Sequence, residues 1–240
     1  MRYLIGIDDT DNLESRGTGH RARQMAEFLS GIATPLGITR HQLLVSPEIP
    51  YTSHNSSACL LVDAPSDKET LLWEAGREFL LRESAPGSDA GICLAAWDAV
   101  TPCVRAFGAR AKQVVLTQLE AEQTAEDYEL RLEGLTGTHG GIIGALAAVG
   151  LRHEGNDGRF LWLPGLRELS GKYSVAELCQ RGNIDAVHTL DGFILPPETS
   201  VDVGEWVRPI MHGGQAILFV EEREHEWYIL SKDHIKSITG

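Results

Sequence analysis

Three acids near the N-terminus are the residues of this sequence best suited to chemistry. Asp8, Asp9 and Asp11 follow a short apolar run in the segment 6–11, which reads GIDDTD. Hard cations such as Mg²⁺ prefer carboxylate oxygens and usually bind one or two of them together with phosphates. Carboxylates this close together also repel one another unless something neutralises them. The segment predicts either a divalent-metal site that serves a nucleotide or a solvated acidic turn in which Asp11 caps the following segment.

A glycine-rich turn is the second feature with chemical potential. The segment 137–145 reads GTHGGIIGA, so His139, Gly140, Gly141 and Gly144 stand at the start of an apolar stretch. Glycines let a backbone approach a phosphate closely, and the amides at a helix N-terminus point towards an anion. No GK[ST] follows, so the segment is not a Walker A motif. The pattern is as typical of close packing by a short buried helix as it is of phosphate binding.

Two polar segments complete the set of candidates. Thr18 lies in the segment 16–20 (RGTGH), just before an amphipathic stretch. It is either the N-cap of a helix, which is the commoner role, or a hydroxyl placed to meet a phosphoryl group. Asn55 belongs to the segment 51–56 (YTSHNS), which on its own indicates only a hydroxyl-rich turn.

The elements that must position these residues alternate between strands and helices. Apolar runs predict strands at 2–7, 42–45, 57–62 and 90–96. Helical spacing and start signals predict helices at 18–32, from Ser66, at 101–119, at 142–149 and at 174–178. Capping boxes are expected where Ser66 is followed by Glu69 and Ser174 by Glu177.

The pattern of apolar and turn residues changes at about residue 183. From there to 240, short apolar runs alternate with Pro-Pro, Gly-Gly and acidic turns, which is typical of a small β module. We therefore place a domain boundary between 182 and 183. The interleaved strands and helices before it favour an α/β or α+β fold.

Composition narrows the class of protein. The chain has 240 residues and a net charge of −13, with 34 acids against 21 bases. A protein built to hold a polyanion normally carries a basic face, so tRNA is not expected as a partner without a second chain. No apolar stretch approaches the ~20 residues of a membrane span and no leader is evident, which predicts a cytoplasmic protein without a membrane partner. The cysteines form no CxxC pair, as a zinc ribbon would require.

Taken together, these segments resemble the N-terminal part of the archaeal agmatinylcytidine synthetase family, whose members modify the wobble cytidine of an isoleucine tRNA. The resemblance is carried, in matching order over about 1–175, by 6–11, by Thr18, by 50–60 (PYTSHNSSACL) and by 140–150 (GGIIGALAAVG). It implies an α+β fold: a kinase-like α/β domain that binds ATP and Mg²⁺, with a ferredoxin-like segment, over 1–182. The β module over 183–240, and the absence of OB-fold and zinc-ribbon patterns, depart from that family.

The resemblance also implies roles for individual residues. The acids Asp8, Asp9 and Asp11 would hold the metal and the phosphates, and Thr18 would be a candidate phosphoryl acceptor, which places Thr18, Asp8 and Asp11 in the catalytic set. The implied nucleotide-binding residues are Gly140, Gly141, Gly144, His139 and Asn55. The family tends to have Arg-Gly-Asn where this sequence has His54-Asn55.

The expected function is an ATP- and Mg²⁺-dependent phosphotransferase or ligase-like enzyme. Its acceptor would be a small molecule or one that the sequence does not identify. The alternative is a nucleotide- or metal-binding regulatory module without turnover. Whether ATP ends as ADP or AMP stays open, as does the oligomeric state, a homo-oligomer included.

Overall fold

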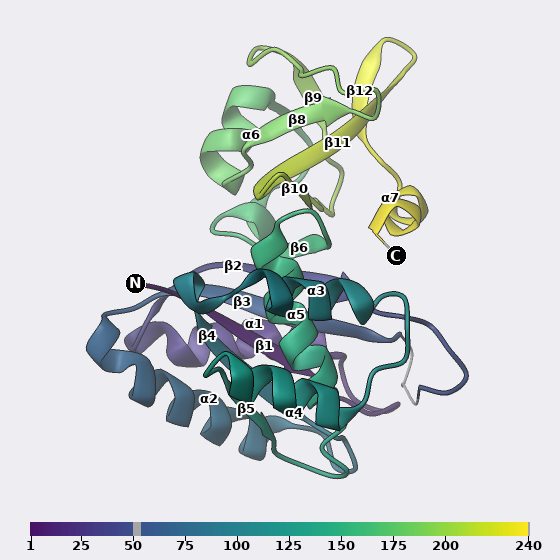
Figure 1. The fold of residues 1–240 in the computed structure, drawn as a ribbon. Coiled ribbons are helices and arrows are strands. Elements are labelled where there is room, and N and C mark those ends of the chain that lie inside the picture. The colour runs from purple at the N-terminus through teal and green to yellow at the C-terminus, as the bar shows by residue number, and fades with distance from the viewer. Residues whose placement is uncertain (50–53, 240) are drawn as a thin grey trace. The chain divides into compact units, whose positions relative to one another are not determined.

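An antiparallel sheet carries the acidic turn at the end of its central strand. The computed structural model describes residues 1–49 and 54–239, and the strand order in this sheet is β5-β4-β1-β3-β2 (Figure 1). The strands are β1 (Arg2–Asp8), β2 (Thr34–Gln42), β3 (Ser56–Asp63), β4 (Gly91–Ala96) and β5 (Arg131–Gly134). Neighbouring strands pair antiparallel, and β1 is hydrogen-bonded to β3 on one side and β4 on the other. Leu4 and Ile5 of this central strand are almost completely buried.

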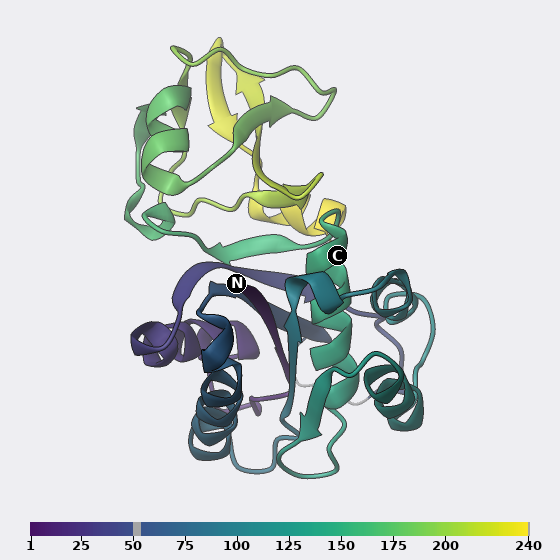
Figure 2. The ribbon, with the colours of Figure 1, turned by 60° about the vertical axis from the view of Figure 1, so that its left-hand side comes forward.

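Helices cover both faces of this sheet. On one face lie α1 (Thr18–Phe28) and α2 (Glu69–Glu83). On the other face α5 (Ile142–Glu154) packs on β1, β3 and β4, and it is flanked by α3 (Pro102–Arg110) and α4 (Gln118–Asp127) (Figure 2). Short 3-10 turns occur at Leu29–Gly31, Ser66–Lys68 and Trp97–Ala99.

The close contact between α5 and β1 depends on a small residue in the strand. A Cβ atom on Gly6 would lie 1.9 Å from the backbone oxygen of Ala145, which is far inside van der Waals contact. Ala145, Leu146 and Val149 of the helix are fully buried. The glycine in the strand therefore sets how closely the helix can approach the sheet, and so where the helix N-terminus lies.

A separate set of elements forms the second compact unit, because the chain divides into Met1–Glu154 and Gly155–Gly240. The strand order within the second unit is β6-β10-β11-β12-β9-β7, and β8 pairs with β11 in parallel. Its strands are β6 (Arg159–Trp162), β7 (Lys172–Ser174), β8 (Ala186–Thr189), β9 (Ser200–Asp202), β10 (Ile210–His212), β11 (Gln215–Arg223) and β12 (Glu226–Ile229). Its helices are α6 (Val175–Gly182) and α7 (Lys232–Thr239), with a 3-10 turn at Leu166–Glu168.

Several expectations from the sequence are confirmed. The fold is α+β, and the strands predicted at 2–7, 57–62 and 90–96 lie within a residue or so of β1, β3 and β4. The capping box at α6 is present: the Ser174 hydroxyl accepts from the backbone N–H of Glu177 at 3.3 Å, and the Ser174 backbone N–H donates to the Glu177 carboxylate at 2.9 Å.

Other expectations differ from the structure. The helix predicted over 101–119 is two helices, because Thr117 and Glu120 form a capping box that starts α4 afresh. The box expected at Ser66 is absent; a 3-10 turn occupies 66–68, and α2 begins at Glu69 without a side-chain cap. The strand predicted at 42–45 lies earlier in the chain, where β2 spans Thr34–Gln42.

The division of the chain also falls earlier than the change of sequence pattern at 183. Phe160, Leu166 and Leu178 precede that point, yet they are buried in one cluster with Val187 and Leu218. Because these side chains share a core with the later strands, the compact units divide after Glu154.

Candidate functional site

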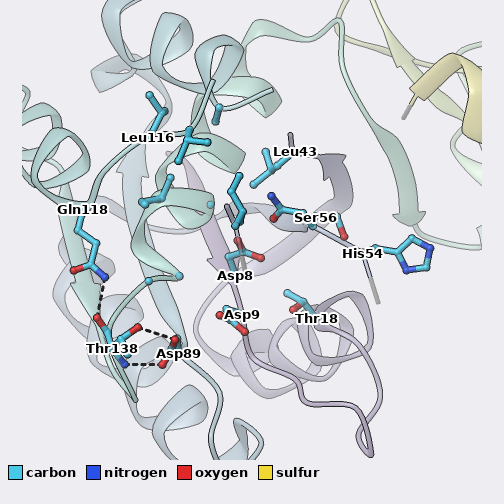
Figure 3. A pocket seen from close by; sticks show the side chains of 18 of the residues that line it. Asp8, Asp9, Thr18, Leu43, His54, Ser56, Asp89, Leu116, Gln118 and Thr138 are labelled. Atoms are coloured by element: carbon cyan, nitrogen blue, oxygen red, sulfur yellow. Dashed lines mark hydrogen bonds between the residues drawn. The ribbon is translucent and has the colours of Figure 1, made fainter. Parts of the chain in front are cut away.

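A cavity of about 270 Å³ opens beside the end of β1, and every residue that lines it belongs to the first unit. It brings together acidic, hydroxyl and glycine segments that are far apart in the sequence (Figure 3). All but one of the predicted site residues line it, namely Asp8, Asp9, Asp11, Thr18, Asn55, Gly140, Gly141 and Gly144. The exception is His139, which lines a different hollow beside β5.

Two carboxyl groups form the acidic end of the cavity. The pKa of Asp8 is raised to about 7, mainly by burial and also by the charges of Asp9 and Asp11, while the Asp9 backbone N–H and Arg40 oppose the rise. Burial also raises the pKa of Asp9 to about 6, helped by the charges of Asp89 and Asp11. Negative charge is therefore costly at this end of the cavity, and a cation bound there would relieve that cost.

Asp11 and Thr18 are joined by hydrogen bonds. The Asp11 Oδ1 atom accepts from the Thr18 backbone N–H at 3.2 Å and from the Thr18 hydroxyl at 2.8 Å. Thr18 is the first residue of α1, and the N-cap position is held by Gly17. The N-cap role considered for Thr18 is therefore wrong. Asp11 supplies the side-chain acceptor at this helix start, which is the capping role considered for Asp11 in the solvated-turn alternative.

The glycines at the start of α5 allow a close approach to the acidic turn. A Cβ atom on Gly144 would lie 1.7 Å from Oδ2 of Asp8, and one on Gly141 would lie 2.5 Å from the backbone oxygen of Asp89. Close packing, one of the two interpretations of this segment, is therefore part of its role. The same approach puts the first turn of the helix against the carboxylates, where Gly140, Gly141 and Gly144 line the cavity.

Asp89 is a cavity residue that the sequence did not single out. It lies just before β4, and its carboxylate accepts hydrogen bonds from the backbone and hydroxyl of Thr138 (Figure 3). On the opposite side of the turn, the Gln118 amide donates to the Thr138 carbonyl at 2.8 Å. Antiparallel pairing puts Asp8 opposite Gly91, so the topology of the sheet brings Asp89 to the site.

Asn55, His54 and His139 differ in where their side chains lie. The buried Asn55 side chain donates to the Leu44 carbonyl at 2.7 Å, which ties the start of β3 to the segment after β2. His54 is exposed, and its ring points away from the acidic turn in Figure 3. His139 has a left-handed backbone, with φ of 66°, and packs against Gly134. Residues 51–53 of the polar segment lie outside the described residues.

Apolar side chains also line the cavity, and in Figure 3 Leu43 and Leu116 lie on the other side of Asp8 from Asp9 and Asp89. The apolar lining includes Leu43, Ile49, Val114, Leu116 and Ile143. Val114 lies in the irregular segment between α3 and α4, where the sequence predicted continuous helix, and 46% of its surface is exposed. A site with a polar end and an apolar end suits a ligand that joins charged groups to a flat ring.

The donors available to a metal ion are few. Over 1–49 and 54–239, no group of three or more His, Cys, Asp or Glu side chains is arranged to hold one. Asp8 and Asp9 both line the cavity and could contribute two of the carboxylate oxygens that Mg²⁺ completes with phosphate oxygens and water. In the same ranges, no helix has the length and apolar character needed to cross a bilayer.

Comparisons with known proteins find relatives among solved structures. No family model and no curated protein matches the chain. A structure of apo TiaS, an agmatidine synthetase of isoleucine tRNA, is similar with a TM-score of 0.54 and 25% identity, covering 62% of this chain and 35% of that one. A complex of TiaS with its tRNA and ATP matches with a TM-score of 0.55 and 26% identity, covering 62% and 36%.

A third structure, described as a tRNA fluorescent labeling enzyme, gives a TM-score of 0.55 and 27% identity over the same 62% of this chain and 36% of its own. The chain thus spans about a third of the length of the structures it matches. The family resemblance seen in the sequence is confirmed at the level of structure. Over 62% of its length, this chain matches the structure of part of TiaS, the agmatidine synthetase of isoleucine tRNA, at about 25% identity.

Proposed function

We propose that this chain binds ATP together with Mg²⁺ and uses it in a phosphotransfer or ligation reaction on a small-molecule acceptor or one not yet identified. The main support is that the acidic turn and the glycine-rich turn line one cavity. The structural relatives support the nucleotide, since one of them was solved with ATP. The net charge of −13 argues against tRNA as the acceptor unless a partner chain holds it.

The charge of the cavity explains why a metal would be needed. Its lining includes Asp8, Asp9, Asp11, Glu48 and Asp89, and no lysine or arginine is found among the described lining residues. A bare triphosphate would be repelled by this surface. We expect Asp8 and Asp9 to hold Mg²⁺, which would neutralise the carboxylates and the phosphates together.

The two ends of the cavity fit the two ends of the nucleotide. The backbone N–H of Gly140, at the N-terminus of α5, would face the phosphates. Leu43, Val114 and Ile143 offer an apolar surface to the base. The Thr18 hydroxyl, held by Asp11, lies on the cavity wall as a candidate phosphoryl acceptor.

The first experiment measures ATP affinity by calorimetry with Mg²⁺ and with EDTA. Wild-type protein should bind only with the metal, and Asp8→Asn and Asp11→Asn should each weaken binding about tenfold or more. Asp233→Asn is the matched control, because its side chain is 95% exposed and lies in the second unit. The proposal would be overturned if ATP bound equally well with and without metal. It would also be overturned if the two cavity variants bound ATP as tightly as wild type.

A nucleotide-binding regulatory module without turnover is the second candidate. It is favoured by the lack of a described lysine or arginine in the lining, since phosphoryl-transfer enzymes generally bring a cation to the developing charge. Prolonged incubation with ATP and Mg²⁺, followed by chromatography for ADP, AMP and phosphate, separates the two. Product formation above that of Asp8→Asn supports an enzyme, and tight binding without product supports the module. Intact-mass analysis of the same samples shows whether Thr18 gains a phosphate.

A further inference from the structure

Asp89 touches both of the turns that form the candidate site. Its carboxylate accepts from Thr138, with 2.6 Å from the backbone N–H to Oδ1 and 2.7 Å from the hydroxyl to Oδ2. Its carbonyl accepts from the Gly141 backbone N–H at 2.9 Å. On its other side, the Asp89 backbone N–H is near enough to the carboxylate of Asp9 to lower the pKa of that group. One residue thus joins the acidic turn to the glycine-rich turn.

The glycine-rich turn needs such a support. Gly137 and His139 both have left-handed backbones, with φ of 57° and 66°, and a histidine in that region is strained. Strained backbone persists where its surroundings hold it in place. The fit to Asp89 is tight, because a Cβ atom on Gly137 would lie 1.7 Å from Oδ1 of the carboxylate.

We propose that Asp89 is a positioning residue: its carboxylate fixes Thr138 and thereby holds the Gly140 backbone N–H in the arrangement that receives the phosphates. This inference rests on the proposed nucleotide function. It assigns Asp89 a role through geometry, which separates it from Asp8 and Asp9. Both of its carboxylate oxygens accept hydrogen bonds from donors of the turn.

The geometric role predicts that asparagine can replace the aspartate. In Asp89→Asn, the side-chain oxygen can still accept from the Thr138 N–H, and the new NH₂ can donate to the Thr138 hydroxyl oxygen. Asp89→Ala removes both contacts. With Mg²⁺ present, Asp89→Ala should weaken ATP binding about tenfold or more, whereas Asp89→Asn should stay within about threefold of wild type. If Asp89 acted through its charge or as a metal ligand, Asn would be as damaging as Ala, and that result would overturn the proposal.

A second measurement tests the turn without any nucleotide. Amide hydrogen exchange over 137–144 should be faster in Asp89→Ala than in wild type and unchanged in Asp89→Asn. Asp185→Ala is the matched control, because Asp185 also binds a backbone N–H, that of Ala216 at 2.7 Å, but lies in the second unit. It should leave exchange over 137–144 unchanged. Equal exchange in Asp89→Ala and wild type would overturn the proposal.

The ATP-binding and hydrogen-exchange measurements distinguish a failure of this inference from a failure of the proposed function. If wild-type protein fails to bind ATP with Mg²⁺, the proposed function fails, while hydrogen exchange still decides whether Asp89 holds the turn. Thr138→Val covers the case in which Asp89→Ala does not fold, because it removes only the hydroxyl contact and keeps the shape of the side chain. Amide exchange over 137–144 should be faster in Thr138→Val than in wild type, because the backbone contact with Asp89 remains but the hydroxyl contact is lost. Wild-type exchange in Thr138→Val, with Asp89→Ala unfolded, would count against the proposal.

Discussion

At the scale of single residues, the acidic turn shows a conflict between stability and function. Asp8 ends a buried strand, and burial raises the pKa of its carboxyl group from 3.8 to about 7. A structure optimised for stability alone would place an amide or an apolar group at this position. A costly carboxylate beside a cavity, next to a second one at Asp9 with a pKa of about 6, is typical of functional sites.

The raised pKa predicts how pH acts on the metal-free protein. The folded state keeps the Asp8 proton up to about pH 7, whereas the unfolded chain loses it near 3.8, so stability falls as pH rises through that window. Asp8→Asn removes the effect. In EDTA, the Tm of Asp8→Asn should exceed that of wild type at pH 8, and the difference should shrink as the pH is lowered towards 3.8.

Thermal unfolding of both proteins across this pH range provides the measurement. Asp9→Asn should behave similarly over a narrower window, from about 3.8 to about 6. Asp233→Asn, on the surface of the second unit, should follow the wild-type profile. Parallel profiles for wild type and Asp8→Asn would show that the Asp8 carboxyl group titrates normally.

At the scale of the elements, the position of α5 fixes the site. The N-terminus of this helix meets Asp8 only because the helix lies directly on β1 at Gly6. Gly6→Ala would place a methyl group 1.9 Å from the Ala145 backbone oxygen, and backbone atoms cannot move aside cheaply. Overpacking of this kind costs about 1–3 kcal/mol, so we expect a loss of that size in the free energy of unfolding.

Urea unfolding checks this prediction against a matched glycine. A Cβ atom on Gly31 meets nothing within 4 Å, and its φ lies outside the left-handed region, so Gly31→Ala should be neutral or slightly stabilising. Gly6→Ala should also weaken ATP binding, because the first turn of α5 moves away from Asp8. If the two variants are equally stable, the close approach of α5 to β1 does not limit the fold.

The elements also show what local sequence signals can predict. The Ser174–Glu177 box was predicted correctly, yet the same pattern at Ser66 and Glu69 forms no box, because a 3-10 turn comes first. Helical spacing continued through Val114, but that residue lines the cavity in an irregular segment. Local patterns predict where elements occur, whereas their ends depend on contacts that form only in the folded chain.

In the candidate site, too, some residues carry local patterns, whereas another is brought in only by the folded chain. The acids of 8–11, Thr18 and the glycines at 140–144 carry recognisable local patterns, and they line one cavity. Asp89 has no such pattern, because it is a single acid in a loop. It reaches the site through the antiparallel pairing of β1 with β4, which a local motif cannot reveal.

At the scale of the whole molecule, the cavity and the second unit are built from separate parts of the chain. The core of the first unit includes Leu4, Phe107 and Leu146, and that of the second includes Phe160 and Leu218. Each cluster draws its buried residues from one unit alone. Every described residue that lines the cavity precedes Glu154 and so belongs to the first unit.

This separation predicts that the fragment 1–154 folds and binds ATP by itself. A domain of about 150 residues buries roughly 70% of its chain surface on folding, which is enough for an independent core. With Mg²⁺ present, its Kd for ATP should lie within about threefold of the full chain, because no described lining residue is lost. Calorimetry on both proteins, with Asp8→Asn made in each, tests this. A fragment that shows native circular dichroism and cooperative unfolding but binds ATP tenfold more weakly would show that the second unit acts on the site. Its role would then be regulatory, since none of its residues is among the described lining of the cavity.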